Sequence, residues 1–445
     1  MSSPLDGEEV DISGVYVTAV ASNGFFIQEI STSTNSSGVF VYNTGDLPSE
    51  NDIVNVAGEV NEYRGETQIG SSSYEIIASD ASLPFDPITL TLPLSEVDDF
   101  ERYEGMLVSV MASSDNSVVV SEYYNFDRFG EVLACSVNSE KKRPYQFSQE
   151  QSPSTDGYES YQEAFGGACV TVDDNQNTQN PDPVLFGAIH ECNSESCFQG
   201  GAIITVLEGP LSYAFGKYRI NPLDLEYENI DESETTPPVL PESEVKIAQV
   251  NLLNYFVTYR SDGGRGADDE DEFVRQRTKT VNALDLIGAD FFGFAELENV
   301  DGNLAAKDLK MRLNEVSART YEAVSISSSI DKIGDDAIKN DIFYDSDRFD
   351  LISAHTLDDS SVSDSLLSES TKSAIFDGYN RVPLAAVFES KESGKTILIV
   401  VNHFKSKGSS NSEGIDADQG DGAASWNQMR YLASKALLNW YEDTL

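Results

Sequence analysis

Three polar residues close apolar stretches in the second half of this chain, and their types suit metal and acid–base chemistry. Asn251 follows "VKIAQV", Glu296 follows "FFGFA", and His403 follows "ILIVVN". A carboxylate placed behind an apolar run is costly to bury unless a cation meets it, so Glu296 is a candidate ligand for Mg²⁺, Mn²⁺ or Ca²⁺. The imidazole of His403 can move a proton. Lys405 follows it closely and would raise the local potential for a phosphate oxygen.

Taken singly, each of these residues has a structural explanation. A Glu at a strand end is commonly solvated or a cap, an Asn commonly sits in a turn, and a His is commonly held by hydrogen bonds. Together they form the set that phosphodiester hydrolysis requires. A hard ion stabilises the phosphoryl oxygen and the leaving alkoxide, a His transfers a proton, and cations offset the charge that develops on the phosphate.

The elements that must position these residues are read from periodicity. The strand "VKIAQVNLL" leads through an Asp/Gly loop to a helix that repeats Phe273, Val281 and Leu284 and ends at Gly288. The strand "DFFGFAELEN" comes next. Further helices are expected over 303–319 and 425–441, with strands near 321–327, 338–344, 383–389 and 396–401. Alternating strands and helices predict a sheet covered by helices, with its site at the strand ends.

The preceding residues favour strands instead. Short Val/Ile/Tyr/Phe runs between Gly, Asn and Ser turns predict an OB-like β-barrel over 10–82, and sparser runs predict a second β domain with cysteine loops over 83–230. An acidic, proline-containing linker is expected over 231–244. The α/β domain then runs over 245–445. The predicted fold class is therefore multidomain, all-β followed by an α/β sandwich.

The chain carries a net charge of -47, and the charge is unevenly spread. Residues 1–235 hold 8 basic and 40 acidic residues, whereas 236–445 hold 21 and 36. An anionic substrate is therefore least repelled by the second half. The longest apolar runs fall well short of the roughly 20 residues that cross a membrane, and no obligate protein partner is indicated.

All four cysteines lie in one loop-rich window of the first half, which favours two disulfides and an oxidising compartment. Three pairings are possible. The favoured one joins Cys192 to Cys197 and leaves Cys135 with Cys169. The alternative is a zinc site with His190, whose spacing fits the usual patterns poorly. We expect an extracellular protein whose signal peptide is not part of this chain.

With these residues laid out, the sequence resembles the secreted bacterial endonucleases of the ExeM/NucH type, in the endonuclease/exonuclease/phosphatase (DNase I-like) superfamily. The resemblance runs from about residue 12 to the end. It depends on motifs such as "VAGEVNEYRGETQI", "VNLLNYF", "GRGAD", "GFAELEN", "GDDAIKNDIFY", "YNRVPLAAVF", "VVNHFKSKG" and "DGAASWNQMR".

The resemblance implies metal-dependent hydrolysis of extracellular DNA or RNA, with Mg²⁺ or Mn²⁺, and assigns roles by position. Asn251 and Glu296 would place the metal and phosphate, and His403 would be the first catalytic His. Arg381 and Lys405 would contact phosphate. Asp336 would orient His403. Gln276 and Lys279 belong to the motifs without an evident role.

The chain also departs from the family. A Gly-Asp-x-Asn motif and a later Asp-His pair are absent, Ser425 replaces a usual Cys, and "DADQGDG", 416–422, leaves Ca²⁺ possible. These gaps predict an inactive, C-terminally incomplete fragment. Two other functions stay open: a lipid or sugar phosphoesterase of the same superfamily, and a non-catalytic β protein that binds extracellular DNA or polysaccharide.

Overall fold

A computed structural model describes residues 3–30, 37–138, 143–176, 178–181, 184–186, 190–192, 199–229, 245–408 and 411–444. The chain divides into two compact units, Met1–Thr235 (unit 1) and Thr236–Leu445 (unit 2), and each is described by itself. The predicted linker, 231–244, lies outside the described residues, and the domain boundaries expected from the sequence stay predictions.

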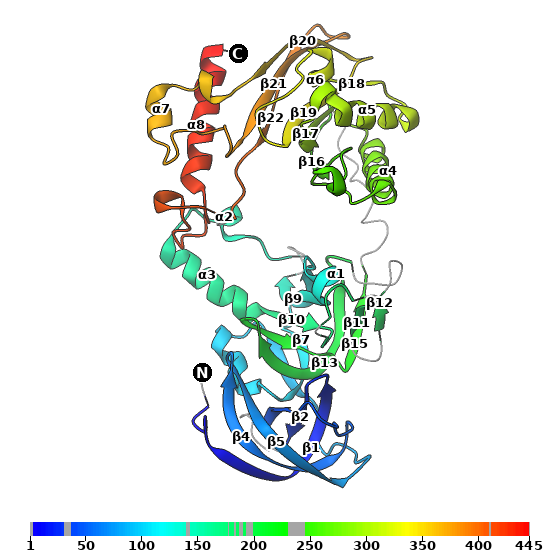
Figure 1. Cartoon of the computed structure of the whole chain (residues 1–445), viewed down its shortest axis with the longest axis vertical. Coiled ribbons are helices and arrows are strands. Elements are labelled where there is room, and N and C mark those ends of the chain that lie inside the picture. Colours follow the sequence, from blue (N-terminus) through cyan, green and yellow to red (C-terminus); the bar gives the residue numbers. More distant parts are fainter. Residues whose placement is uncertain are drawn as a thin grey trace. The chain divides into compact units, whose positions relative to one another are not determined.

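Unit 1 begins with a closed barrel, as the run of short strands predicts (Figure 1). Alternate residues of these strands, among them Val17, Phe25, Val41 and Ile69, fill its interior and are at most 1% exposed. In barrel order the strands are β1 (Glu9–Ala21), β2 (Gly24–Gln28), β3 (Gly38–Tyr42), β5 (Glu66–Ala78) and β4 (Ile53–Tyr63).

The second sheet of unit 1 is built around one long strand, β13 (Ile203–Ala214), which pairs with four others. The remaining strands of the sheet are β6 (Ile88–Leu92), β7 (Leu107–Ala112), β8 (Asn116–Glu122), β9 (Glu131–Asn138), β10 (Cys169–Asp173), β14 (Lys217–Ile220) and β15 (Asp224–Glu228). A separate pair comprises β11 (Val184–Phe186) and β12 (His190–Cys192). Short helices are η1 (Val97–Tyr103), α1 (Phe126–Phe129) and α2 (Phe147–Glu150).

A helix, α3 (Thr155–Ala168), lies where only strands and loops were expected. Ser154 caps its start by accepting a hydrogen bond from the backbone N–H of Gly157 (3.2 Å). The helix leads into Cys169 of β10, which lies opposite Cys135 of β9. These two cysteines form a disulfide, as the favoured pairing requires. The side chains of Cys192, Cys197 and His190 lie outside the described residues, so the second disulfide and the zinc alternative stay open.

Unit 2 contains two sheets. The first has the order β16 (Ile247–Tyr255), β17 (Phe291–Glu298), β19 (Ile338–Asp345), β18 (Tyr321–Ala323), and the second is β20 (Phe349–Thr356), β21 (Arg381–Ser390), β22 (Thr396–His403). The helices are α4 (Glu270–Ile287), α5 (Leu304–Val316), α6 (Val324–Ser327), α7 (Asp364–Ser368) and α8 (Asn427–Thr444). Single turns are η3 (Arg260–Asp262), η4 (Asp301–Asn303), η5 (Asp359–Ser361) and η6 (Gly414–Asp416).

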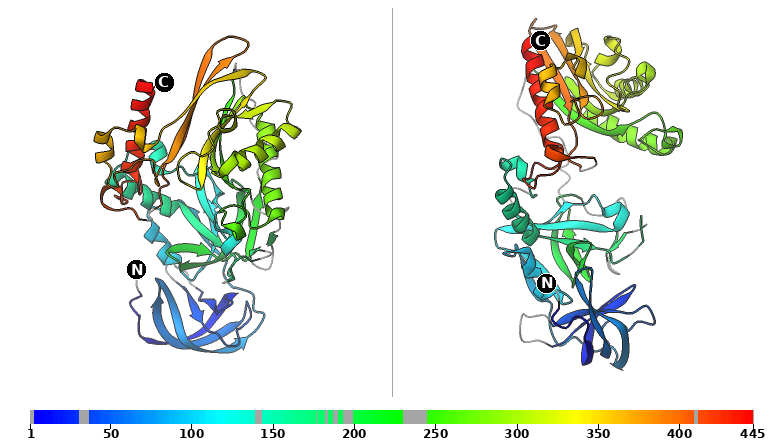
Figure 2. Two further views of the ribbon diagram at one scale, coloured as in Figure 1. Left: turned by 45° about the horizontal axis from the view of Figure 1, so that its top comes forward. Right: turned by 60° about the vertical axis from the view of Figure 1, so that its left-hand side comes forward.

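The two sheets of unit 2 lie between helices: α8 covers the β20–β22 sheet, and α4 and α5 cover the β16–β19 sheet (Figures 1 and 2). Phe291 packs with residues of both sheets and with those of α8, whereas Phe292 packs with α4 and α5. Successive residues of β17 thus enter opposite cores, which explains the unbroken apolar run "FFGFA". In the described part of the chain, no helix is long and apolar enough to cross a membrane.

The predicted helices of unit 2 are confirmed within a few residues, and Gly288 ends α4 in the left-handed conformation (φ 55°). The strand expected over 321–327 is wrong in its second part, because residues 324–327 form α6. Strand β20 was not anticipated. Its interior residues alternate poorly between apolar and polar types, so periodicity gave little signal there.

Candidate active site

Asn251 and Glu296 are brought together by the parallel pairing of β16 with β17, in which Asn251 lies beside Ala295. The Nδ2 of Asn251 donates to Glu296 Oε1 (3.0 Å), and the backbone N–H of Asn254 donates to Oε2 (3.1 Å). Glu296 has a φ of 63° at a shift in strand register, where a bulge redirects its side chain. The carboxylate is 19% exposed and held at both oxygens.

His403 reaches the same place from the second sheet. Its Nε2 lies 3.8 Å from Glu296 Oε1, and its side chain is 21% exposed. Across the β21–β22 ladder it is paired with Arg381. Burial, followed by the guanidinium of Arg381, lowers the pKa of His403 below its usual 6.5, against the opposing effect of Glu296 and Asp336. The imidazole is therefore neutral at neutral pH and able to accept a proton.

Asp336 is held by two arginines. Its Oδ1 lies 3.1 Å from Arg265 Nη1, and its Oδ2 lies 3.3 Å from Arg381 Nη2. The Nδ1 of His403 is buried without a hydrogen-bond partner, so Asp336 does not hold the imidazole in this structure. Asp336 was expected to orient His403, and the structure instead places it as the counter-charge of two guanidinium groups.

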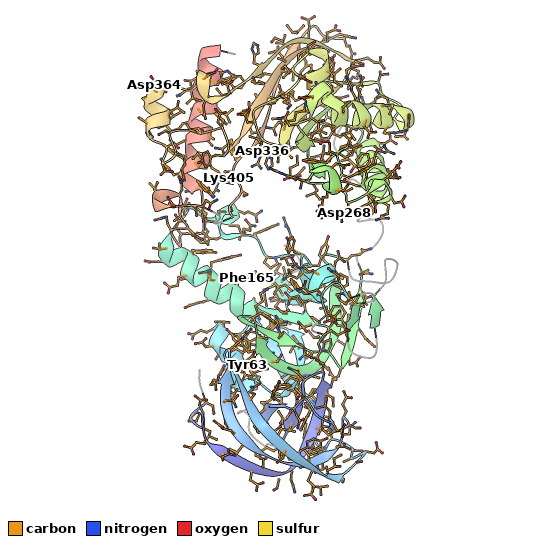
Figure 3. All side chains as sticks on the ribbon, in the orientation of Figure 1. Tyr63, Phe165, Asp268, Asp336, Asp364 and Lys405 are labelled. Carbon is orange, nitrogen blue, oxygen red and sulfur yellow. A yellow bond between two sulfur atoms is a disulfide. The ribbon has the colours of Figure 1, made fainter. Side chains whose placement is uncertain are left out.

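Lys405 follows His403 by two residues, but its side chain contacts Trp426 rather than the other residues of the site. Its backbone N–H donates to Asn380 Oδ1 (2.8 Å), and its ammonium lies over the ring of Trp426, 5.4 Å from the centroid. That arrangement is a cation–π contact with a ring that is 1% exposed. Figure 3 labels Lys405 and Asp336, which lie in two different loops of unit 2. A phosphate contact by Lys405 stays a prediction.

Two supporting residues were not assigned roles from the sequence. Gln276, on α4, donates through Nε2 to the carbonyl oxygens of Leu253 (3.2 Å) and Leu252 (3.4 Å). Leu253 and Asn254 both have positive φ, so this bond supports the tight turn that presents Asn251. Glu298 accepts from the backbone N–H groups of Val257 and Thr258 (2.8 and 3.2 Å). Glu298 closes the same strand as Glu296, and the sequence marks both as polar residues at its end.

The oxygen ligands present suit a magnesium-type ion that is bound by few protein groups. Among the described residues, no three His, Cys, Asp or Glu side chains are grouped so as to hold a metal. Mg²⁺ commonly needs only one or two carboxylates, with waters and substrate phosphate completing its shell. Glu296, partly exposed beside the Asn251 amide, fits that requirement.

The acidic side chains of the loop 416–422, which the sequence leaves possible as a calcium site, accept hydrogen bonds from protein groups. Asp416 is 1% exposed and accepts from the backbone N–H of Met429 (3.0 Å) and from Thr371 Oγ1 (2.6 Å). Asp418 and Asp421 accept from the backbone of Gly420 and Ala423 (both 2.9 Å). The loop is thus held by its own hydrogen bonds and fixes the start of α8.

Comparison with known proteins gives only distant likenesses. No protein-family model and no curated protein matches the chain. The human Nocturnin catalytic domain with bound sulfate anion matches at 16% identity, 45% of this chain, 58% of that chain and a TM-score of 0.27. An endonuclease/exonuclease/phosphatase family protein from Bacteroides thetaiotaomicron is 16% identical over 45% of this chain and 59% of that chain, with a TM-score of 0.28. D. rerio TDP2 complexed with single strand DNA product is 11% identical over 46% of this chain and 57% of that chain, with a TM-score of 0.26.

The chain spans less than two thirds of the length of each of these structures. At such TM-scores the likenesses carry no weight for function, and we rely on the geometry of the site instead.

Proposed function

We propose that unit 2 is a metal-dependent phosphodiesterase domain that acts on nucleic acid outside the cell. The observation that carries the proposal is the convergence of Asn251, Glu296, Arg381 and His403, which come from four strands of two different sheets. Asn251, Glu296 and Arg381 lie more than 40 residues apart in the sequence. Packing of the fold alone does not require an amide, a carboxylate, a guanidinium and an imidazole to meet at one place.

Each residue has a role that follows from its position. Glu296, steadied by Asn251 and the turn at Asn254, would hold a divalent ion, which supplies positive charge to the phosphoryl oxygen and leaving group when bound. Arg381 donates to the phosphate through nitrogen atoms on the same face as His403. The neutral imidazole of His403 accepts a proton from the attacking water.

The proposed location is supported by the disulfide between Cys135 and Cys169, because such bonds persist mainly in oxidising compartments. Nucleic acid as substrate is supported by the local cations of the site, Arg381 beside His403 and Arg265 across Asp336, within a unit that is acidic as a whole.

The test combines ion binding with hydrolysis by the full 445-residue chain. We expect Mn²⁺ binding, followed by electron paramagnetic resonance, to fall about 10-fold or more in Glu296→Gln. His403→Ala should keep the ion but abolish any plasmid nicking. Nicking by the chain as it stands would show that the expected inactivity was wrong. If Mn²⁺ binds equally to the wild type and Glu296→Gln, and nicking is insensitive to both variants, the proposed function is refuted.

A further inference from the structure

Arg265 belongs to the loop between β16 and α4, and it shares one carboxylate with Arg381. Each oxygen of Asp336 meets a different guanidinium: Oδ1 meets Arg265 Nη1 at 3.1 Å, and Oδ2 meets Arg381 Nη2 at 3.3 Å. The side chain of Arg381 is 17% exposed, whereas that of Arg265 is 52% exposed. The carboxylate therefore separates an inner cation from an outer one.

The loop that bears Arg265 is held firmly against the strand that bears Asn251. Glu298 accepts from the backbone at its start, and Gly264 donates to the carbonyl of Tyr259 (2.9 Å). At Gly264 the packing is so close that an added Cβ would lie 1.9 Å from the carbonyl oxygen of Thr258. The loop backbone is thus set by close packing, and the guanidinium of Arg265 is held by its contact with Asp336 before any ligand binds.

Stability does not explain this arrangement. An ion pair with a half-exposed arginine contributes little to folding. What the arrangement does provide is two guanidinium groups around one carboxylate, and the nearby Glu296 offsets their remaining positive charge until it holds a divalent ion. This charge lies in a unit that has 36 acidic and 21 basic residues. It is located where Arg381 adjoins His403 and the Arg265 side chain extends toward solvent.

In the proposed function, the reacting phosphodiester occupies the inner position, beside Arg381 and His403. A polynucleotide carries a further phosphate about every 3.4 Å along the axis of each strand. Its next phosphate would lie outward, on the side of Asp336 where Arg265 is exposed. Asp336 keeps the two cations apart and prevents their mutual repulsion from displacing Arg265.

We propose that Arg265 binds the phosphate next to the scissile one, so that the site selects polynucleotides over molecules with a single phosphodiester. This inference rests on the proposed function, because it takes the inner position as the reacting one. Arg265 would determine specificity by binding the phosphate that lies outside the reacting one.

The test is equilibrium binding of a fluorescein-labelled thymidine dodecamer to the full chain in Mg²⁺, followed by anisotropy at several salt concentrations. Arg265→Gln should reduce the slope of log K against log salt by about 0.7, the value for one contact to a single strand. At 50 mM salt the same loss corresponds to about 5–10-fold weaker binding. Bis(p-nitrophenyl) phosphate, which has one phosphodiester, should displace the dodecamer with the same inhibition constant in both proteins, once the weaker dodecamer affinity of the variant is taken into account.

The matched control is Arg260→Gln. Arg260 lies in the same loop, pairs with Asp268 (3.3 Å) and is 62% exposed, and Asp268 lies apart from Asp336 in Figure 3. We expect its slope and affinity to equal those of the wild type. Arg265→Lys should recover most of the slope, because a point charge still releases counterions.

The outcomes separate the two proposals. Absence of any oligonucleotide binding by the wild type refutes the proposed function. Wild-type binding that is unchanged in Arg265→Gln overturns only the role of Arg265. An equal loss of affinity for the dodecamer and for bis(p-nitrophenyl) phosphate also overturns it, because Arg265 would then serve the inner phosphate.

Discussion

The two units differ in how they accommodate buried carboxylates. In unit 1, Glu104 Oε1 accepts from the backbone of Thr67 (2.8 Å), but its Oε2 is buried without a hydrogen-bond partner. Burial, and then three neighbouring glutamates, raise the pKa of Glu104 to about 8. Burial likewise raises the pKa of Glu66 to about 7 and that of Asp174 to about 7.

In unit 2, two of the most buried carboxylates face cations. Asp290 has a side chain only 2% exposed, and it pairs with Arg319 (2.7 Å) and with Arg348. Arg319 also pairs with Asp345 (2.6 Å), whose side chain is 4% exposed. The difference between the units follows from the number of basic residues available for pairing, since residues 1–235 have 8 basic residues for 40 acidic ones. In unit 1, Arg219 pairs with Glu131 and Asp173. Glu104, Glu66 and Asp174 lack such a partner among the described residues and have raised pKa values. Unit 2 pairs Asp290 and Asp345 with arginines and has further arginines available for a site.

The largest expected effect comes from removing a paired carboxylate. Asp290→Ala leaves Arg319 and Arg348 without their shared partner and also removes the acceptor of the Lys246 backbone N–H (2.8 Å). We expect a loss of about 2–4 kcal/mol in the unfolding free energy of unit 2. Urea unfolding followed by tryptophan fluorescence measures this unit, because both tryptophans, Trp426 and Trp440, lie in it.

The control for this prediction is Asp350→Ala. Asp350 is 61% exposed and pairs with Lys391 (3.3 Å), so its removal should cost less than about 1 kcal/mol. Equal losses in the two variants would show that buried pairing does not distinguish unit 2.

A smaller, pH-dependent effect is expected in unit 1. Because the folded-state pKa of Glu104 is raised from 4.5 to about 8, its proton stabilises the folded state below pH 4.5, and this stabilisation is lost as the pH rises to about 8. Glu104→Gln imitates the protonated group. It should leave stability nearly unchanged at pH 5 and add about 1–2 kcal/mol at pH 8. Thermal unfolding by circular dichroism should then shift upward by ~2–8 °C at pH 8.

Glu59→Gln makes the same charge change at an exposed position of the barrel and should shift the midpoint little at either pH. If Glu104→Gln has the same effect at pH 5 and pH 8, Glu104 is ionised in the folded protein and the contrast between the units fails there.

The smallest effect concerns His403. Burial, and then Arg381, lower its pKa, so Arg381→Gln should raise the pKa of His403, while burial continues to lower it. The chain has three histidines, and a titration of ¹³C-labelled imidazoles by NMR resolves the change. Arg260→Gln should leave the titration unaltered. A wild-type pKa above 6.5 would contradict the proposed neutral imidazole.

Much of unit 2 could be predicted from the chain, because its strands and helices have strong periodicity. The helix that ends at Gly288 and the strand before Glu296 were expected where they occur. Unit 1 was harder. Helix α3 contains Gly157, Gly166 and Gly167, which disfavour a helix, although Tyr158, Tyr161 and Phe165 recur at helical spacing and stack on one another.

The residue types of the site and their places at strand ends were determined by the sequence alone, since the alternation of buried runs and polar termini is local information. Tertiary structure decided which polar groups meet. Asp336 pairs with Arg265 and Arg381, and Lys405 lies over Trp426. These pairings join segments distant along the chain, and they depend on strand register and loop packing, neither of which is contained in the spacing of residues within one element.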